Sequence, residues 1–194
     1  NETLTSPLGY IYEKLTANST LNEGDELMIY RNGCAAADID GIATGHYLDA
    51  VAVASTTDVS NPDILNFTLG KLEEDSPLWT LTNQYGQALT ANAKQSLTWN
   101  EGDPLWNITL GYGGATITNA TEGYGTLRFN APTNSYACFA LYTSKSLHLP
   151  YLYKKVGQNR PIPCTNIAFE TTALTASIDE GHVAFAPSRA PRLA

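Results

Sequence analysis

The chain has 194 residues and a formal net charge of −8, and only 15% of its residues are charged, against about 25% in a typical soluble domain. Its lysines and arginines are few and scattered, which argues against the basic stripe that nucleic-acid-binding proteins carry. No apolar run reaches the ~20 residues of a membrane span, so we expect neither a nucleic-acid partner nor membrane insertion.

Short strands separated by turns fill the chain from residue 26 to residue 155. The first clear strand is 26–31, and Asn32-Gly33 after it is a strong hairpin signal, so 34–39 is expected to return beside it. The expected strands, after a short one at 8–12, are 26–31, 34–39, 47–54, 64–69, 79–83, 87–90, 96–99, 105–110, 115–119, 126–130, 136–142 and 150–155. Regular short spacing without a helical period is typical of an all-β barrel or sandwich.

The twelve strands from residue 26 onward divide into three groups of four, at 26–72, 77–111 and 115–155. Leu81-Thr82-Asn83 returns 36 residues later as Ile117-Thr118-Asn119, which indicates a structural repeat. One such unit cannot bury its apolar face alone, whereas three units around an axis can. The sequence therefore predicts a β-trefoil-like barrel of three four-strand units, with a β-sandwich as the alternative.

The barrel is predicted to span residues 1–156 as one domain. Residues 157–194 fall outside the repeat and begin with a run rich in glycine and proline. We expect a linker there, followed by a short C-terminal β extension or the start of a further module, because so few residues cannot build a core of their own.

Three cysteines, Cys34, Cys138 and Cys164, are an odd number without the spacing of a zinc site. Buried free thiols are expected, and one disulfide plus a free thiol is the alternative. The abundance of Thr, Ser, Asn and Gly is common on secreted surfaces, so an extracellular or cell-surface location is expected.

The stretch from residue 127 to residue 155 resembles the end of an accessory β module found in large secreted or surface-anchored proteins of gut bacteria. The resemblance is carried by Leu127-Arg128-Phe129-Asn130, by the run from Cys138 to Ser144, and by Leu152-Tyr153-Lys154-Lys155. The opening run from Gly9 to Lys14 fits as well, so the likeness covers about residues 8–156.

This resemblance implies a non-catalytic appendage, often attached to an enzyme or an adhesin. The chain departs from the pattern at Ala137-Cys138, where an aromatic residue and an arginine are usual. The Gln-x-Trp signature of ricin-type lectins is absent from all three units, so that family's sugar site is not carried over.

Candidate ligand-binding residues are sought in the loops, because Trp79, Trp99 and Trp106 alternate with aliphatic residues on the expected core face. Tyr112 and Tyr124 stand in glycine-rich loops and are candidate exposed aromatics for stacking on a sugar. Asp103, in an acidic turn, is the candidate polar partner.

Asp38 and Asp40 alternate on one face before Gly41 and resemble the start of a calcium loop, although the other loop ligands are missing. A plain Asp-Gly turn is the competing interpretation. Calcium bound by Asp38 and Asp40 is thus a weak expectation, and no other cofactor is expected.

The first functional hypothesis is a non-catalytic extracellular binding or spacer module whose partner is a glycan or a protein at the cell surface. The second is a β-trefoil protease inhibitor that presents a rigid loop, 55–62 or 143–149. The third is a carbohydrate-active enzyme, for which the candidate carboxylates lie in the acidic turns Glu73-Glu74-Asp75 and Glu101-Gly102-Asp103. It ranks last because no nucleophilic elbow, phosphate loop or metal-ligand histidine pair occurs in the sequence.

Overall fold

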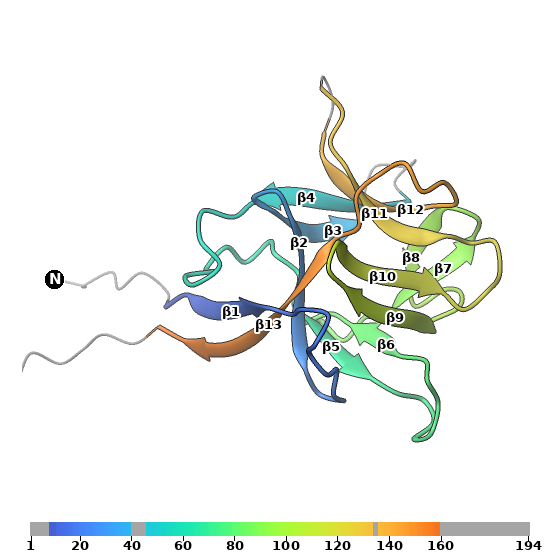
Figure 1. Ribbon diagram of the computed structural model, residues 1–194, viewed down its shortest axis with the longest axis horizontal. Helices are drawn as coiled ribbons and strands as arrows, with labels where there is room; N and C mark the ends of the chain where they lie inside the picture. The colour runs from blue at the N-terminus through green and yellow to red at the C-terminus, as the bar shows by residue number, and fades with distance from the viewer. Residues whose placement is uncertain (1–7, 40–45, 134–135, 160–194) are drawn as a thin grey trace, which may run out of the picture. The chain divides into compact units, whose positions relative to one another are not determined.

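The structure is a computed structural model, and it describes residues 8–39, 46–133 and 136–159 (Figure 1). Every regular element in these ranges is a β-strand, so the prediction of an all-β fold is confirmed for them. The strands are β1 (Tyr10–Lys14), β2 (Glu26–Arg31), β3 (Cys34–Ile39), β4 (Leu48–Ala52), β5 (Phe67–Gly70), β6 (Thr80–Thr82), β7 (Leu89–Ala93), β8 (Ser96–Trp99), β9 (Trp106–Gly111), β10 (Gly114–Asn119), β11 (Thr126–Asn130), β12 (Cys138–Tyr142) and β13 (Tyr151–Gln158).

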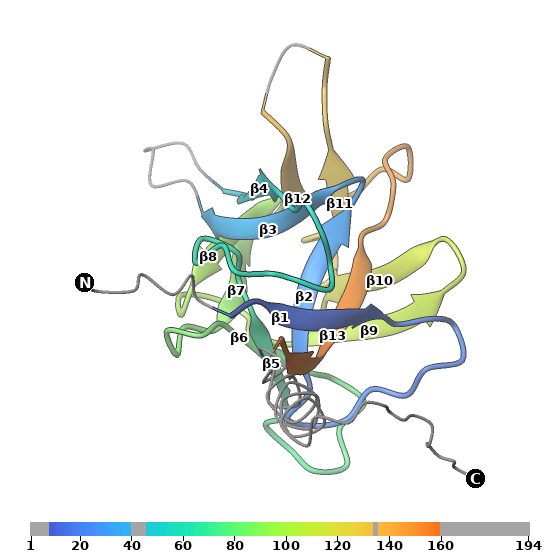
Figure 2. The ribbon, with the colours of Figure 1, turned by 90° about the vertical axis from the view of Figure 1, so that its left-hand side faces the viewer.

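The strands form a curled antiparallel sheet in the order β1-β13-β2-β3-β4-β12-β11-β10-β9, and β5 joins β2 to β6. The fold contains three hairpins: β3–β4 and β11–β12 lie within this sheet, and β7–β8 forms a separate two-stranded sheet. Two of them lie side by side because β4 also pairs with β12 (Figure 2).

Six strands follow one another by strand pairing or, at two places, by backbone hydrogen bonds to a flanking residue, and the series returns to its starting strand. β2 pairs with β5, β5 pairs with β6, and β9 pairs with β10. Trp79, just before β6, exchanges two backbone hydrogen bonds of 2.8 Å with Trp106 of β9. Ala115 of β10 donates to the Pro150 carbonyl at 2.7 Å, one residue before β13 begins, and β13 pairs with β2.

Each of the twelve predicted strands has a counterpart, and four have exactly the predicted bounds: β2, β3, β8 and β11. The fifth strand begins at Phe67 rather than residue 64, because Ile64 and Leu65 are buried in the segment before it. The last strand extends to Gln158 because its second half pairs with β1.

The main core lies inside the curled sheet. Ile29 of β2, Leu81 of β6 and Ile117 of β10 are each 0% exposed, so both residues of the 36-residue echo from Leu81 to Ile117 lie in this core. Trp106 is also fully buried, as predicted, whereas Trp79 and Trp99 are half-buried and pack against the core from its edge.

A second, smaller core lies on the outer face of β2 and β3. It consists of Tyr12, Met28, Ala35, Val59 and Ile64. β1 and the 53–64 segment cover this face, since the backbones of Tyr10 and Val59 exchange two hydrogen bonds of 2.8 Å. This layer was not predicted from the sequence.

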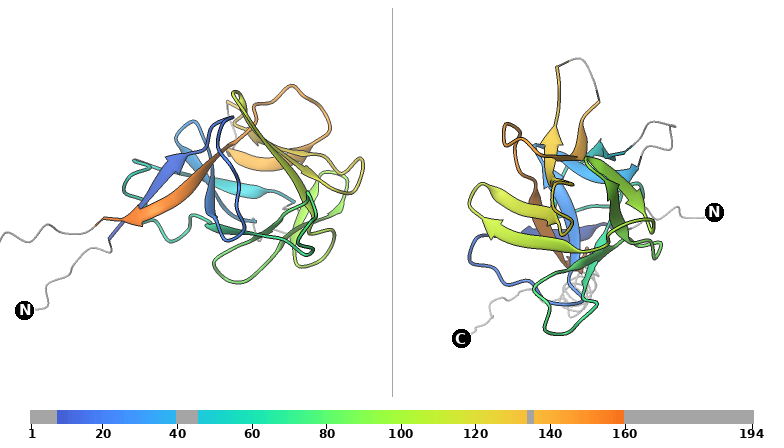
Figure 3. Two further views of the ribbon diagram at one scale, coloured as in Figure 1. Left: turned by 60° about the horizontal axis from the view of Figure 1, so that its bottom comes forward. Right: turned by 90° about the vertical axis from the view of Figure 1, so that its right-hand side faces the viewer.

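β1 and the far half of β13 form a ribbon in which Tyr10 pairs with Gln158 (Figure 3). Cys34 and Cys138 are free thiols, whereas Cys164 and the predicted C-terminal β extension lie outside the described residues. In the part of the chain that the structure describes, no helix is long and apolar enough to cross a membrane.

Candidate functional site

An open cleft of about 270 Å³ lies between the hairpin β3–β4, the segment before β5 and the turn after β6. Its lining residues are Ala37, Asp38, Asp49, Val51, Asp63, Leu65 and Tyr85. Three carboxylates and one tyrosine therefore surround a small apolar floor.

Two of the carboxylates come from the hairpin itself. Asp38 stands near the end of β3, where a register shift between Ala36 and Ile39 interrupts the regular alternation. Its Oδ1 accepts a hydrogen bond of 2.9 Å from the indole Nε1 of Trp99. Asp49 stands on β4 opposite Cys138, and its negative charge adds to the effect of burial in raising the pKa of the Cys138 thiol.

Tyr85 forms the rim of the cleft and is 66% exposed. Its backbone N–H donates to Asn83 Oδ1 at 3.0 Å, which fixes the turn. The neighbouring Gln84 binds the opposite wall: its Oε1 accepts from Asn66 N at 2.9 Å and its Nε2 donates to Ile64 O at 3.1 Å. The turn that carries Tyr85 is thus held beside the segment that carries Asp63.

The three aspartates of this cleft can accept hydrogen bonds from a ligand, and Tyr85 adds an aromatic ring beside them. Ionised carboxylates accept and do not donate, and none of the lining residues is a lysine or an arginine. The cleft therefore suits a ligand rich in hydroxyl donors and disfavours an anionic one.

The predicted ligand-binding residues do not form one cluster. Tyr112 is 89% exposed in the β9–β10 turn, at one end of β10. Tyr124 follows the other end and is half-buried against the main core rather than exposed. Asp103 lies near that end, where its Oδ2 accepts from Thr121 Oγ1 at 2.6 Å and its Oδ1 accepts from Leu105 N at 2.9 Å. A ligand-binding role for these three residues stays a prediction.

The calcium hypothesis rests on Asp38 and Asp40, of which Asp40 lies outside the described residues. Asp38 lines the cleft, and calcium binding by Asp38 and Asp40 stays a prediction. Among the described residues, no three His, Cys, Asp or Glu side chains are arranged to hold a metal ion.

One Ser–His contact resembles part of a catalytic pair. His46 Nδ1 lies 3.0 Å from Ser96 Oγ, but Ser96 donates its hydroxyl proton to Asn92 Oδ1 at 2.7 Å and is 7% exposed. A general base must receive that proton, so this arrangement suits a structural link between two segments better than nucleophilic catalysis.

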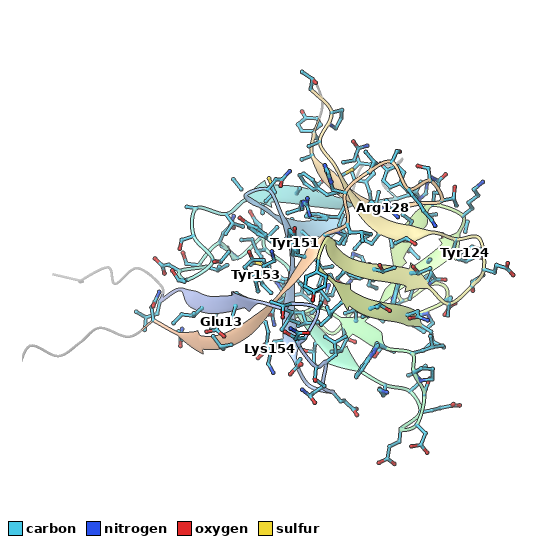
Figure 4. All side chains as sticks on the ribbon, viewed as in Figure 1. Glu13, Tyr124, Arg128, Tyr151, Tyr153 and Lys154 are labelled. Carbon is cyan, nitrogen blue, oxygen red and sulfur yellow. The ribbon has the colours of Figure 1, made fainter. Side chains whose placement is uncertain are left out.

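Both long loops proposed for protease inhibition are tied to the body of the protein. In the 55–62 loop, Thr56 O accepts from Tyr12 N and Thr57 O accepts from Asn159 Nδ2, each at 2.8 Å. In the 143–149 loop, Leu147 O accepts from Arg128 Nη1 at 2.7 Å, and Arg128 is labelled in Figure 4.

Sequence reasoning assigned Asp49 to no site, and it missed Asp63 and Tyr85. Each of the two missed residues stands in a turn that the sequence indicates, after Pro62 and before Gly86. No local signal could have brought these turns together with β3 and β4, because the contacts between them are long-range.

No family model and no curated protein matches the chain. The structure is similar to a chain in the crystal structure of cytolethal distending toxin from Actinobacillus actinomycetemcomitans, with a TM-score of 0.47 and 13% identity. The similarity covers 73% of this chain and 97% of that one. No family is assigned, and the proposals below rest on the described residues.

Proposed function

We propose that the curled sheet is a β-trefoil. The series of pairings from β2 through β5, β6, β9, β10 and β13 back to β2 supports a six-stranded barrel. The three hairpins between these strands fit one cap hairpin for each unit. Closing strands into a barrel removes exposed edges, which favours such an arrangement.

On this scaffold we infer a non-catalytic binding module that holds a neutral glycan in the cleft at Tyr85. The observation that carries the proposal is the meeting of three aspartates with an anchored, exposed tyrosine around an apolar floor. Sugar hydroxyls donate strong hydrogen bonds to carboxylates, and the apolar face of a pyranose packs on an aromatic ring.

The proposal includes a place outside the cell, in an accessory module of a secreted or surface-anchored protein. The support is compositional, together with the resemblance to accessory modules of gut bacteria. That the module is non-catalytic is supported by Asp103, whose two carboxylate oxygens are occupied by Thr121 and Leu105.

A glycan array followed by calorimetry on the best neutral oligosaccharide tests the proposal. Tyr85→Ala and Asp49→Asn should each weaken binding about tenfold or more, because each removes a direct contact. Tyr136→Ala is the matched control, since Tyr136 is 87% exposed but does not line the cleft. Absence of neutral-glycan binding, or binding that both cleft variants leave intact, would overturn the proposal.

Hydrolysis of a bound glycan is measured in the same samples. Activity that disappears on changing Glu101 or Asp103 would make the chain an enzyme and reject the non-catalytic proposal.

A protease inhibitor is the second candidate, and the bonds that hold the 55–62 loop favour it. A rigid loop with exposed side chains binds with a small loss of conformational entropy. Inhibition of any member of a protease panel at micromolar concentration, abolished by replacing Thr57 and Asp58 with glycine, would support this function. A panel without inhibition would remove it.

A further inference from the structure

Two cations meet at one aromatic ring on the β1–β13–β2 face. Lys14 Nζ lies 3.6 Å from the centroid of the Tyr151 ring, and the Arg31 guanidinium lies 4.6 Å from the same centroid. Lys14 comes from β1 and Arg31 from β2. Tyr151, which is labelled in Figure 4, stands on β13 between these two strands. A strand order of this kind concentrates positive charge at one place in a chain of net charge −8.

These two cations differ from their neighbours in having no carboxylate partner among the described residues. Lys154 pairs with Asp25 at 2.7 Å and Lys155 pairs with Glu26 at 3.1 Å. These are the two ion pairs in the part of the chain that the structure describes. The positive charge of Lys14 and Arg31 is therefore not neutralised there.

The guanidinium of Arg31 is fixed in position by neutral groups. Its Nη1 donates to Gly113 O at 3.3 Å and to Leu149 O at 3.2 Å, while its buried Nε has no hydrogen-bond partner among the described residues. A buried charged donor without a partner is costly. A nearby anion would offset part of that cost.

The hydrogen bond from Arg31 to Gly113 O links the β9–β10 turn, which contains an exposed aromatic residue, to Arg31. Gly113, which accepts from Arg31, follows Tyr112 in the β9–β10 turn, and Tyr112 is 89% exposed. Gly114 in this turn also lies against Leu149 and Pro150, so the turn packs on the segment that leads into β13. The exposed Tyr112 therefore directly precedes the residue whose carbonyl oxygen binds Arg31.

We propose that Lys14, Arg31, Tyr112 and Tyr151 form a second binding site, for an anionic saccharide that presents a carboxylate or sulfate group. The cations take the anionic group, and the exposed ring of Tyr112 takes the sugar face. A saccharide fits better than an acidic peptide because the site combines a charge pair with a solvent-exposed aromatic surface. This site is separate from the Tyr85 cleft, whose carboxylates would repel the same ligand.

Calorimetry with the full chain at physiological salt tests the site with three probes: a sulfated oligosaccharide, its desulfated counterpart and an oligouronate. Lys14→Gln and Tyr112→Ala should each weaken binding of an anionic probe about tenfold. Lys94→Gln is the matched control, because Lys94 is an exposed lysine in the β7–β8 turn and its loss changes the net charge equally. Tyr85→Ala should leave this binding unchanged, so failure of the cleft proposal and failure of this one are distinguishable.

Binding of both anionic probes with weak binding of the desulfated one supports the proposal, and whichever anionic probe binds more tightly identifies the group. Absence of binding by both, or equal losses from Lys14→Gln and Lys94→Gln, overturns it. A Glu-rich peptide is the final probe, and tighter binding of this peptide than of either anionic saccharide would reject the saccharide class.

Discussion

The Tyr85 cleft and the β1–β13–β2 face combine an exposed tyrosine with charges of opposite sign. Three aspartates line the cleft, whereas Lys14 and Arg31 both contact the Tyr151 ring on the β1–β13–β2 face. The net charge of −8 predicts only the first of these. Local pairing, rather than total charge, decides which ligand chemistry each region can accept, because distant charges are screened at physiological salt.

A hydrogen-bonded series links the two regions. Tyr12 of β1 donates to Asn66 Oδ1 at 2.7 Å, and Asn66 Nδ2 donates to Glu26 Oε1 at 2.7 Å, where Lys155 also binds. Asn66 N in turn donates to Gln84 beside the cleft. Changes in the shared core should therefore affect both regions, and changes at either site should affect one.

The largest expected effect comes from Trp106→Ala, which removes a support that both regions share. Trp106 is fully buried, and its indole Nε1 donates to Leu89 O at 2.9 Å. We expect a loss of about 3–5 kcal/mol in the free energy of unfolding, measured by urea denaturation. Tyr136→Ala, a surface control, should change it by less than about 0.5 kcal/mol. A loss below about 1 kcal/mol would show that the series of six strands does not depend on this side chain.

A smaller effect is expected from Asp25→Asn, which removes an ion pair with Lys154 of β13 and no contact of the Tyr85 cleft. Asp25 is 7% exposed, binds Lys154 at 2.7 Å, and accepts from Asn22 N at 3.0 Å. Because Lys154 is 35% exposed and its charge is partly screened, we expect a loss of about 1–2 kcal/mol in urea denaturation.

The same variant frees the charge of Lys154, which stands on the strand β13 that also carries Tyr151. Binding of the sulfated oligosaccharide should stay equal or strengthen slightly, while neutral-glycan binding at the cleft stays unchanged. Glu13→Gln is the control, because Glu13 is exposed and has no ion pair among the described residues. Equal destabilisation by the two variants would contradict a specific role for the pair.

Tyr12→Phe tests the series that links the two regions, and it does so through pH. Burial raises the pKa of Tyr12 above its ordinary value of about 10, and the charge of Glu26 raises it further. Below pH 10 the phenol is neutral in both states, so its contribution to stability is complete. As the pH rises above 10, only the unfolded chain ionises there, and this contribution is lost.

The variant should lose about 1 kcal/mol at pH 7, because the hydrogen bond to Asn66 is removed. The difference in the free energy of unfolding between the variant and the parent chain should narrow between about pH 9.5 and 11. This window is set by the ordinary tyrosine pKa of about 10. Urea denaturation across that range measures it, with Tyr136→Phe as the control. If the free energies of unfolding of the parent and the variant changed in parallel with pH, the raised pKa of Tyr12 in the folded chain would be contradicted.

The sequence predicted the fold well where signals are local. Asn32-Gly33 and the alternation around it place β2 and β3 to the residue, and both Asn32 and Gly33 have positive φ values of 49° and 79°. The start of β5 was misplaced because Ile64 and Leu65 have the apolar character of a strand but are buried as a loop wall. Hydrophobicity reports burial there, not backbone pairing.

The sites could not be predicted in the same way. Asp38, Asp49, Asp63 and Tyr85 belong to four segments that meet through long-range pairing, and a register shift in β3 interrupts the alternation around Asp38. Tyr112 was correctly expected to be exposed, but Arg31, which donates to the carbonyl of the next residue, Gly113, comes from the distant strand β2. Charge complementarity across strands has no signature along the chain.

The smallest expected effect separates orientation from contact within the cleft. Trp99→Phe removes the indole donor that holds Asp38 at 2.9 Å and keeps an aromatic ring next to Phe67, whose centroid lies 6.2 Å away. Stability should fall by less than about 1 kcal/mol, and neutral-glycan affinity about three- to fivefold, because Asp38 loses one of the bonds that orient it. Binding of the sulfated oligosaccharide should not change.

A double-mutant cycle with Asp38→Asn decides whether Trp99 acts through Asp38. If it does, the second substitution should weaken glycan binding less in the Trp99→Phe background than in the parent chain, because the oriented carboxylate is already impaired. Additive losses would mean that Trp99 contacts the ligand directly. A fall in sulfated-oligosaccharide binding in the single variant would show that the two regions are coupled through the core, and would break the contrast between them.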